Sequence, residues 1–247
     1  MSRPSSLRTE VRAPPLFAAD SIGKSFGSRT ILKAASVWGR AGKITVLFGR
    51  NGCGKSTLLK IGAGQLGLDH GVVQFAGRAY LRPRLHDMAA RGLFYLPDRD
   101  LLSRRLTVRE QIRAVEWRFG VSRTGEILER LGIGARLDQT PAELSGGERR
   151  RAEIAAAWIR APLCLLADEP FAGIDPADAE VVAEAFRGMA RQGCAIVITG
   201  HEVRQLLDTA DDIVWMAAGT THGMGTPEEA AQHEQFRREY LGAVRLD

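Results

Sequence analysis

Residues 49–57 have the residue types and the spacing needed to bind phosphate. They read GRNGCGKST and lie between an apolar run that predicts a strand, 43–48, and a run that predicts the start of a helix, 58–61. Glycines leave the backbone N–H groups free to converge on phosphate oxygens at a helix N-terminus. The stretch therefore predicts a nucleoside triphosphate site made of Gly49, Arg50, Asn51, Gly52, Cys53, Gly54, Lys55, Ser56 and Thr57.

A second stretch, 162–170, predicts the hydrolytic groups. It reads PLCLLADEP, a continuous apolar strand that ends in paired carboxylates. At the carboxyl end of a buried parallel strand, Asp168 is expected to face a magnesium ion beside the Ser56 hydroxyl, while Lys55 reaches the outer phosphates. Glu169 is then placed to polarise a water for attack on the γ-phosphate. The alternative is that the two carboxylates only cap a helix.

Two further sites fit the same chemistry. Ser145-Gly146-Gly147 opens a predicted helix, and a Ser cap followed by two glycines exposes backbone N–H groups as a second anion-binding end. His201 follows a buried-strand candidate, 194–199, on the side where the phosphate chemistry is expected, which favours a γ-phosphate contact. An ordinary helix cap and a structural histidine are the alternatives.

The remaining elements must position these groups. Residues 16–20 and 30–38 predict two strands separated by a turn at 23–28, and 71–76 and 92–96 predict two more. Residues 107–119 and 124–131 predict amphipathic helices of an insert, and Pro176 is expected to open a helix that ends near Gln192. Phe26, in the predicted turn, is either a loop hydrophobe or an aromatic that stacks on adenine.

Composition limits the class of protein. An apolar fraction of 45% is typical of a globular protein with a full core, and the longest apolar runs are too short for a membrane span. Residues 1–15, rich in Arg, Ser and Pro, predict a disordered tail without a signal-peptide core. The three cysteines are too few and too scattered for a disulfide framework, which favours a reducing cytosol. The net charge of +5 leaves a nucleic-acid partner open.

Together these stretches resemble an ATP-binding cassette ATPase, the nucleotide-binding subunit of an ABC transporter. GRNGCGKST, LSGGE, LLADEP, GIDP and TGH stand in the order typical of that family, and the resemblance spans residues 16–242. The resemblance implies an α/β fold of the P-loop NTPase type with a RecA-like core, an antiparallel β subdomain and an inserted α-helical subdomain. It divides the chain into a core, 16–98 and 159–242, and a helical subdomain, 99–158.

The resemblance also implies roles and partners. Phe26 matches the adenine-stacking aromatic, Asp168 the Walker B carboxylate and Glu169 the catalytic base, while Asp175 falls in the D-loop and His201 is the switch histidine. ATP and Mg²⁺ are the implied cofactors, with Lys55 and Glu169 in hydrolysis and Ser56 and Asp168 on the metal. A second cassette, most simply another copy of this chain, would close over ATP with Ser145, Gly146, Gly147 and Glu148 of its signature motif.

The resemblance further places the protein on the cytosolic face of the inner membrane, with the helical insert docked on an integral membrane partner. YLPDRDLLSRRLTVREQ, LSGGERRRAEIA and FRREYLG are most like ATPases of lipopolysaccharide export and branched-chain amino acid import. A nucleic-acid partner is not expected. A cytosolic ABC ATPase acting on DNA or ribosomes, or an ATP-sensing regulator, is the alternative function.

One residue departs from the family pattern. Asp98 stands at the end of the strand 92–96, where the family usually has a glutamine that touches magnesium and the attacking water. A carboxylate is also a hard oxygen ligand, but it is shorter and negatively charged. We therefore expect Asp98 to contact the metal and to change the magnesium dependence or the basal rate of hydrolysis.

Overall fold

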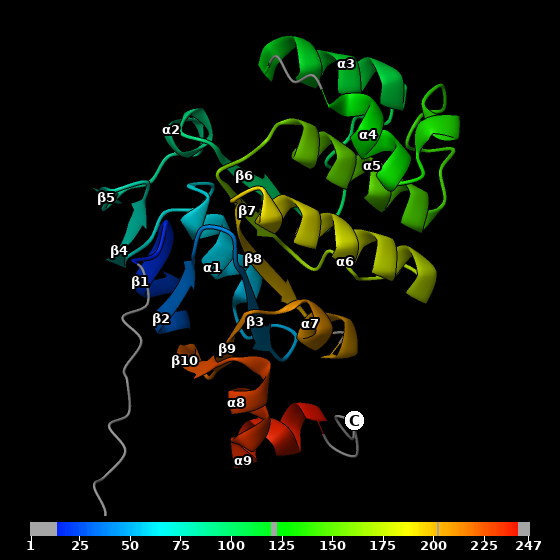
Figure 1. The fold of residues 1–247 in the computed structure, drawn as a ribbon. Coiled ribbons are helices and arrows are strands. Elements are labelled where there is room, and N and C mark those ends of the chain that lie inside the picture. The colour runs from blue at the N-terminus through cyan, green and yellow to red at the C-terminus, as the bar shows by residue number, and fades with distance from the viewer. Residues whose placement is uncertain (1–13, 120–122, 202, 242–247) are drawn as a thin grey trace, which may run out of the picture.

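The computed structural model describes residues 14–119, 123–201 and 203–241. Its strands form one ten-stranded sheet with the order β5-β4-β1-β2-β10-β9-β3-β8-β7-β6 (Figure 1). The strands are β1 Phe17–Phe26, β2 Arg29–Gly39, β3 Ile44–Gly49, β4 His70–Phe75, β5 Arg78–Tyr80, β6 Leu93–Leu96, β7 Cys164–Ala167, β8 Ala195–Gly200, β9 Asp212–Ala217 and β10 Thr220–Gly225. The predicted N-terminal tail lies outside the described residues, except Pro14 and Pro15.

Strand β3 occupies the centre of the parallel half of the sheet. It pairs in parallel with β8 and β9, and β7 and β6 continue the same direction beyond β8. Its side chains alternate, as a strand buried on both faces requires: Ile44, Val46 and Phe48 enter one core and Leu47 enters the other. Because the parallel strands point the same way, the residues that follow them meet at one edge of the sheet.

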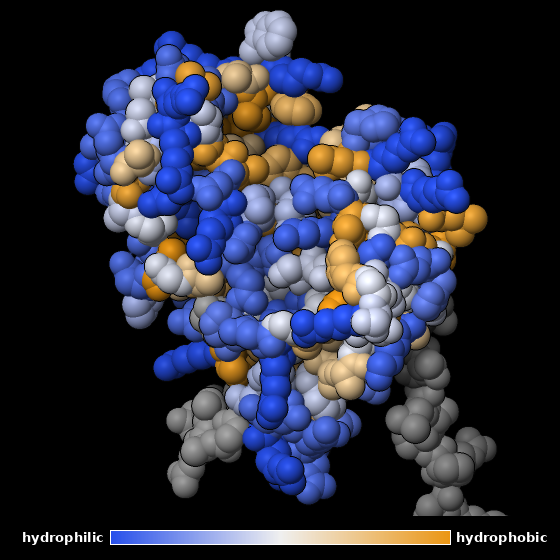
Figure 2. Space-filling model, turned by 180° about the vertical axis from the view of Figure 1, so that it is seen from behind, coloured by the Kyte–Doolittle hydropathy of each residue, from blue (hydrophilic) through white to orange (hydrophobic). Residues whose placement is uncertain are grey.

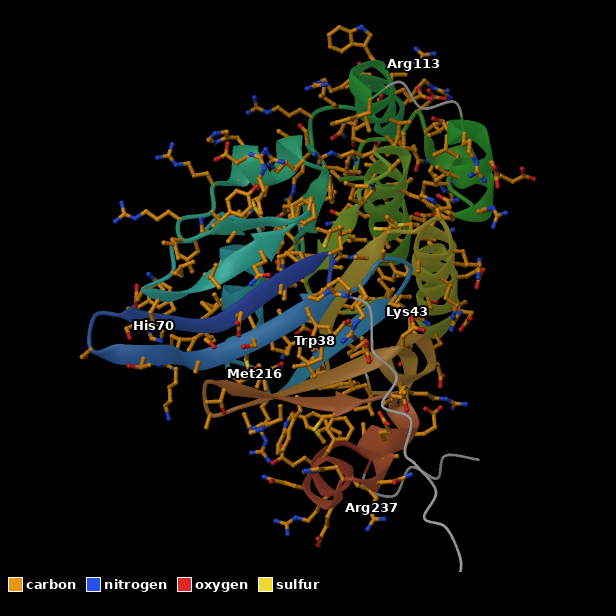
Figure 3. All side chains as sticks on the ribbon, turned by 60° about the vertical axis from the view of Figure 1, so that its left-hand side comes forward. Trp38, Lys43, His70, Arg113, Met216 and Arg237 are labelled. Carbon is orange, nitrogen blue, oxygen red and sulfur yellow. The ribbon has the colours of Figure 1, made fainter. Side chains whose placement is uncertain are left out.

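The antiparallel half consists of β5, β4, β1 and β2. The prediction that residues 23–28 form a turn was wrong in extent, because β1 continues to Phe26 and β2 begins at Arg29. Gly23 lies within β1 rather than in a turn. A Cβ at this position would come 1.8 Å from the His70 imidazole of β4, so only glycine permits the close approach of the two strands. Figure 3 shows His70 beside the β1–β2 hairpin.

Helices cover the parallel half on both faces. The helices of the described residues are α1 Lys55–Gly62, α2 Leu85–Ala90, α3 Val108–Phe119, α4 Thr124–Arg130, α5 Gly146–Ile159, α6 Pro176–Arg191, α7 Val203–Thr209, α8 Pro227–Gln232 and α9 Glu234–Phe236, with the 3-10 helix η1 Gly134–Arg136 and the π-helix η2 Arg237–Leu241. Helix α1 lies between the two halves of the sheet, and α3 and α4 pack on α5 beyond the end of β6 (Figure 1). The helices α3 and α4 of the predicted insert thus share one hydrophobic core with α5, α6 and β3.

The C-terminal segment returns to the central strand. Phe236 and Tyr240 lie against Phe48 of β3, with ring centroids 5.5 and 5.6 Å away. In Figure 3, Arg113 on α3 lies near the top of the molecule and Arg237, at the start of η2, lies near the bottom. Within the three described ranges, none of the helices has the length and apolar content of a membrane span.

Candidate functional site

The glycine-rich loop connects β3 to α1 as the sequence predicts. Strand β3 ends at Gly49 and α1 begins at Lys55. Gly52 and Gly54 have φ angles of +78° and +113°, which only glycine adopts without strain. The N-cap of α1 is Gly54, and no side chain caps this helix, so its first N–H groups face the loop. A Cβ on Gly49 would come 2.6 Å from the Cys53 sulfur, which explains a glycine at this position.

Lys55 is held inside this loop. Its side chain is 4% exposed, and Nζ donates a hydrogen bond to the Gly49 carbonyl at 2.7 Å. The same ammonium lies 3.4 Å from Glu169 Oε1. A buried cation at the start of a helix whose N–H groups are uncapped makes the loop an anion site.

Three hydroxyl groups surround the carboxylate of Asp168. Ser56 Oγ and Thr199 Oγ1 donate to Oδ1 at 2.9 and 2.7 Å, and the Tyr95 hydroxyl donates to Oδ2 at 3.0 Å. Burial, followed by the charge of Asp168, raises the pKa of Tyr95, so this hydroxyl stays protonated and remains a donor. The Asp168 side chain, 1% exposed, is therefore fixed in the orientation that meets Ser56.

Glu169 follows directly and turns the chain away from β7. Its φ angle is +47°, in the left-handed region that non-glycine residues rarely adopt. Its N–H donates to Thr199 Oγ1 at 3.0 Å, and its Oε2 lies 2.8 Å from His201 Nδ1. Glu169 and His201 both line a cavity of about 480 Å³.

The second predicted anion end is a well-formed helix start. Ser145 is the N-cap of α5, and its Oγ accepts from the Glu148 N–H at 3.2 Å while Glu148 accepts from the Ser145 N–H at 2.9 Å. The hydroxyl proton of Ser145 is left to donate elsewhere. The Ser145 N–H, followed by the Arg136 side chain, lowers the pKa of Glu148, so the capping carboxylate stays ionised. The cap uses the N–H groups of Ser145 and Glu148, so those of Gly146 and Gly147 are not part of it.

Gly147 and Asp175 fix how α5 meets α6. A Cβ on Gly147 would overlap the Asp178 carboxylate, which is paired with Arg151 at 2.8 Å. Asp175 is the N-cap of α6 and accepts from the Asp178 N–H at 2.8 Å. The signature stretch and the GIDP stretch thus form one packed corner, in which Gly146 approaches the carbonyl of Gly173.

Other predicted residues lie around this centre. Phe26 is 51% exposed at the end of β1, with the Lys24 ammonium 5.5 Å from its ring centroid. Asp98 and Asn51 line the same cavity as Glu169. Arg50 is solvent-exposed, Cys53 is half-buried, and Thr57 is half-buried in the first turn of α1.

The donor set fits a magnesium ion held together with phosphate. The described residues contain no cluster of three or more His, Cys, Asp or Glu side chains arranged to hold a metal. Magnesium at nucleotide sites usually takes only one or two protein ligands and completes its shell with phosphate and water oxygens. The hydrogen-bonded oxygens of Ser56 and Asp168 are of that kind, and both are hard oxygen donors.

Sequence reasoning missed three residues that hold the site. Tyr95 and Thr199 orient Asp168 and Glu169, and Arg150 is 4% exposed and bonds the carbonyls of Pro97 and Asp98. Tyr95 and Thr199 stand in otherwise apolar strands, where one hydroxyl is the only sequence signal. Arg150 gives no sequence signal, because a basic side chain in a helix is usually exposed to solvent.

Comparison with known proteins identifies the family. The family model described as "ABC transporter" matches residues 32–172, and the chain belongs to this family. It is an ATP-binding and ATP-hydrolysing subunit of the ABC transporter class, as the sequence motifs predicted.

Individual relatives agree with this assignment. The lipopolysaccharide export system ATP-binding protein LptB of Haemophilus influenzae is 35% identical over 92% of this chain and 97% of its own length. LptB of Escherichia coli K12 is 33% identical over 91% of this chain and 96% of its own length. The ADP conformation of MJ1267, an ATP-binding cassette of an ABC transporter, superposes with a TM-score of 0.80 at 24% identity, covering 93% of this chain and 99% of that one. The predicted cassette fold is therefore confirmed.

Proposed function

We propose that Lys55, Ser56, Asp168, Glu169 and His201 carry out magnesium-dependent ATP hydrolysis. Lys55 binds the outer phosphates, and Ser56 and Asp168 hold the metal, which when bound neutralises phosphate charge. Glu169 accepts a proton from the attacking water, and His201, 2.8 Å from its carboxylate, orients Glu169 and contacts the γ-phosphate. The observation that carries this proposal is the contact of Lys55 and His201 with the two oxygens of one carboxylate.

Nucleotide recognition involves further groups of the loop and of the first strand. The backbone N–H groups of residues 49–57 bind phosphate oxygens at the start of α1. Phe26 stacks on the adenine ring, which its exposure of 51% permits. Asp98, which lines the cavity beside Glu169, would supply a third oxygen ligand to the metal.

A second copy of this chain is the proposed partner across the nucleotide. The start of α1, which no side chain caps, and the start of α5 are two separate helix N-termini of one chain, and a helix N-terminus favours an anion. If two chains dock head to tail, Ser145, Gly146 and Gly147 of one chain cover ATP held by Lys55 of the other. Glu148 then maintains the cap, and Asp175 keeps the GIDP loop at the interface.

The surface between the helical group and α2 is the proposed docking site for an integral membrane subunit. Figure 2 shows apolar side chains gathered in a hollow between the lobe of α3 and the lobe of α2. Large exposed apolar residues of these segments are Leu81, Leu85, Leu106, Trp117 and Phe119. A contiguous exposed apolar surface of this kind is typical of a protein interface. This docking would hold the protein on the cytosolic face of the membrane.

The named relatives favour a place in the lipopolysaccharide-export branch. Two LptB proteins match this chain over more than nine-tenths of its length. We therefore propose that ATP hydrolysis drives the export of an envelope glycolipid through the membrane partner. In the domain division proposed from the sequence, with a core of 16–98 and 159–242 and a helical subdomain of 99–158, this docking surface lies where the two parts meet, because Leu81 and Leu85 belong to the core range and the other three residues to the helical range.

The proposed function is tested by Glu169→Gln in the complex purified from membranes in mild detergent. Loss of the general base lowers kcat about 10²–10⁴-fold, whereas ATP affinity is retained. Lys55→Ala is the matched control, because it weakens nucleotide binding itself. Mass spectrometry of the same preparation should find a stoichiometric membrane protein. Full activity of Glu169→Gln would reject its role as base, and recovery with nucleic acid alone would reject the transporter partner.

A further inference from the structure

Helix α5 carries a buried ion pair that the hydrolytic mechanism leaves unused. Arg150 and Glu153 are 4% and 2% exposed, and their side chains meet at 3.0 Å. Buried ion pairs seldom stabilise a fold more than apolar residues of the same volume would, because both charges lose their hydration. The pair therefore calls for a specific structural task.

The pair binds backbone groups of the segment that follows β6. Arg150 donates to the Pro97 carbonyl at 2.9 Å and to the Asp98 carbonyl, and Glu153 accepts from the Leu101 N–H at 3.2 Å. Residues 97–101, the segment that follows β6, are thus attached to α5 at three backbone points. The same guanidinium lies 3.5 Å from the Glu169 carbonyl.

The position of the pair along α5 gives these bonds their significance. Arg150 is five residues after the N-cap Ser145. At a rise of 1.5 Å per residue, the two residues are about 7.5 Å apart along the helix axis. One rigid helix therefore joins the end that covers the partner's nucleotide to the segment that carries Asp98 in its own site. A movement of α5 is expected to displace this segment, because three bonds from two buried side chains of the helix hold it.

We propose that Arg150 and Glu153 are positioning residues that attach the segment 97–101 to α5. Docking of Ser145–Gly147 on the nucleotide held by the partner chain then positions Asp98 at the nucleotide held by its own chain. The inference rests on the proposed head-to-tail dimer for its second half only. The attachment of the segment to α5 is a property of the single chain. The two sites of the dimer would then be coupled through the pair.

Hydrogen–deuterium exchange of the full-length chain tests the attachment. In Arg150→Gln and Glu153→Gln we expect the amides of the segment 97–101, which are those of residues 98–101 because Pro97 has no N–H, to exchange at least tenfold faster, with α1 unchanged. Arg160→Gln is the matched control: its guanidinium lies at the other end of the same helix and donates to the Ala89 carbonyl at 2.7 Å. Unchanged exchange at 97–101 in both pair variants would overturn the proposal.

The coupling is tested with ATP in the Glu169→Gln background, which is expected to hold the dimer closed. ATP should slow exchange both at 145–148 and at 97–101, and adding Arg150→Gln should abolish only the second effect. Retention of both effects would overturn the coupling. Absence of any ATP effect at 145–148 would instead reject the proposed dimer, while the single-chain result still stands. If Arg150→Gln does not fold, Arg150→Lys keeps the charge without the bridging geometry and serves in its place.

A kinetic readout separates positioning from general stabilisation. If Arg150 acts through Asp98, the single-turnover rate of the double variant Asp98→Ala/Arg150→Gln equals that of Asp98→Ala within about twofold, because coupled residues are not additive. The effects of Asp98→Ala and Arg160→Gln should multiply. If the rate effects of Asp98→Ala and Arg150→Gln also multiply in the double variant, Arg150 does not act through Asp98.

Discussion

Replacing Thr199 by valine removes one buried hydroxyl that serves both carboxylates of the site. Thr199 is fully buried, donates to Asp168 at 2.7 Å and accepts from the Glu169 N–H at 3.0 Å. A hydrogen bond to a charged group contributes about 1.5–3 kcal/mol, and an unpaired buried N–H costs about 1–3 kcal/mol. Because valine has the same shape, no cavity term is added. We expect the free energy of unfolding to fall by roughly 3–5 kcal/mol.

The effect should appear in stability and in turnover. For a chain of this size the melting temperature would fall by roughly 6–20 °C, at about 2–4 °C per kcal/mol. The left-handed backbone of Glu169, with φ of +47°, loses the acceptor that holds its N–H, so kcat should fall at least about tenfold. Circular dichroism melting and a steady-state ATPase assay measure the two effects.

Thr199→Ser is the matched control, because it keeps the hydroxyl and loses one methyl group, which costs about 1 kcal/mol. We expect the serine variant to melt close to wild type and to keep most of its activity. If the valine and serine variants melt together and hydrolyse ATP equally, the hydroxyl does not hold the two carboxylates and the reasoning fails.

Two further predictions concern the start of α5. Gly147→Ala should weaken the packing of α5 on α6, because its Cβ would overlap the Asp178 carboxylate; Gly146→Ala, whose Cβ meets only a carbonyl at 3.4 Å, should be milder, and equal melting temperatures would contradict this. Glu148 has a lowered pKa in the folded state, so its contribution to stability is present above its unfolded pKa and is lost as pH falls through the folded value. Urea unfolding from pH 6 to pH 3 should therefore show a weaker pH dependence in Glu148→Gln than in wild type, and parallel curves would exclude the effect.

The parts of the site that depend on local sequence were predictable. Glycine spacing determines the loop before α1, and Ser145 with Glu148 determines the start of α5, since both signals lie within a few residues. The cassette fold followed from the same stretches. Pro176 likewise predicted the start of α6, which the structure confirms, and Asp175 proves to be its N-cap.

The parts that depend on contacts between distant segments were not predictable. Tyr95 and Thr199 meet Asp168 only because β6, β7 and β8 are neighbours in the sheet, and a hydroxyl within an apolar strand reads as core. The turn at 23–28 was placed wrongly because Gly23 serves a contact with His70 on β4. The roles assigned to Asp98 and Phe26 stay predictions until nucleotide binding is measured.

The pairing of β3 has a consequence for how the chain folds during synthesis. This strand precedes the phosphate loop, yet its neighbours β8 and β9 are Ala195–Gly200 and Asp212–Ala217, and its end also packs on Phe236. The β1–β2 hairpin and β4 need only nearby residues and can form while the chain is still growing. The centre of the sheet needs partners about 150 residues later, and such distant pairing is slow. A ribosome-bound chain would therefore acquire its nucleotide site only after the residues up to Ala217 have emerged.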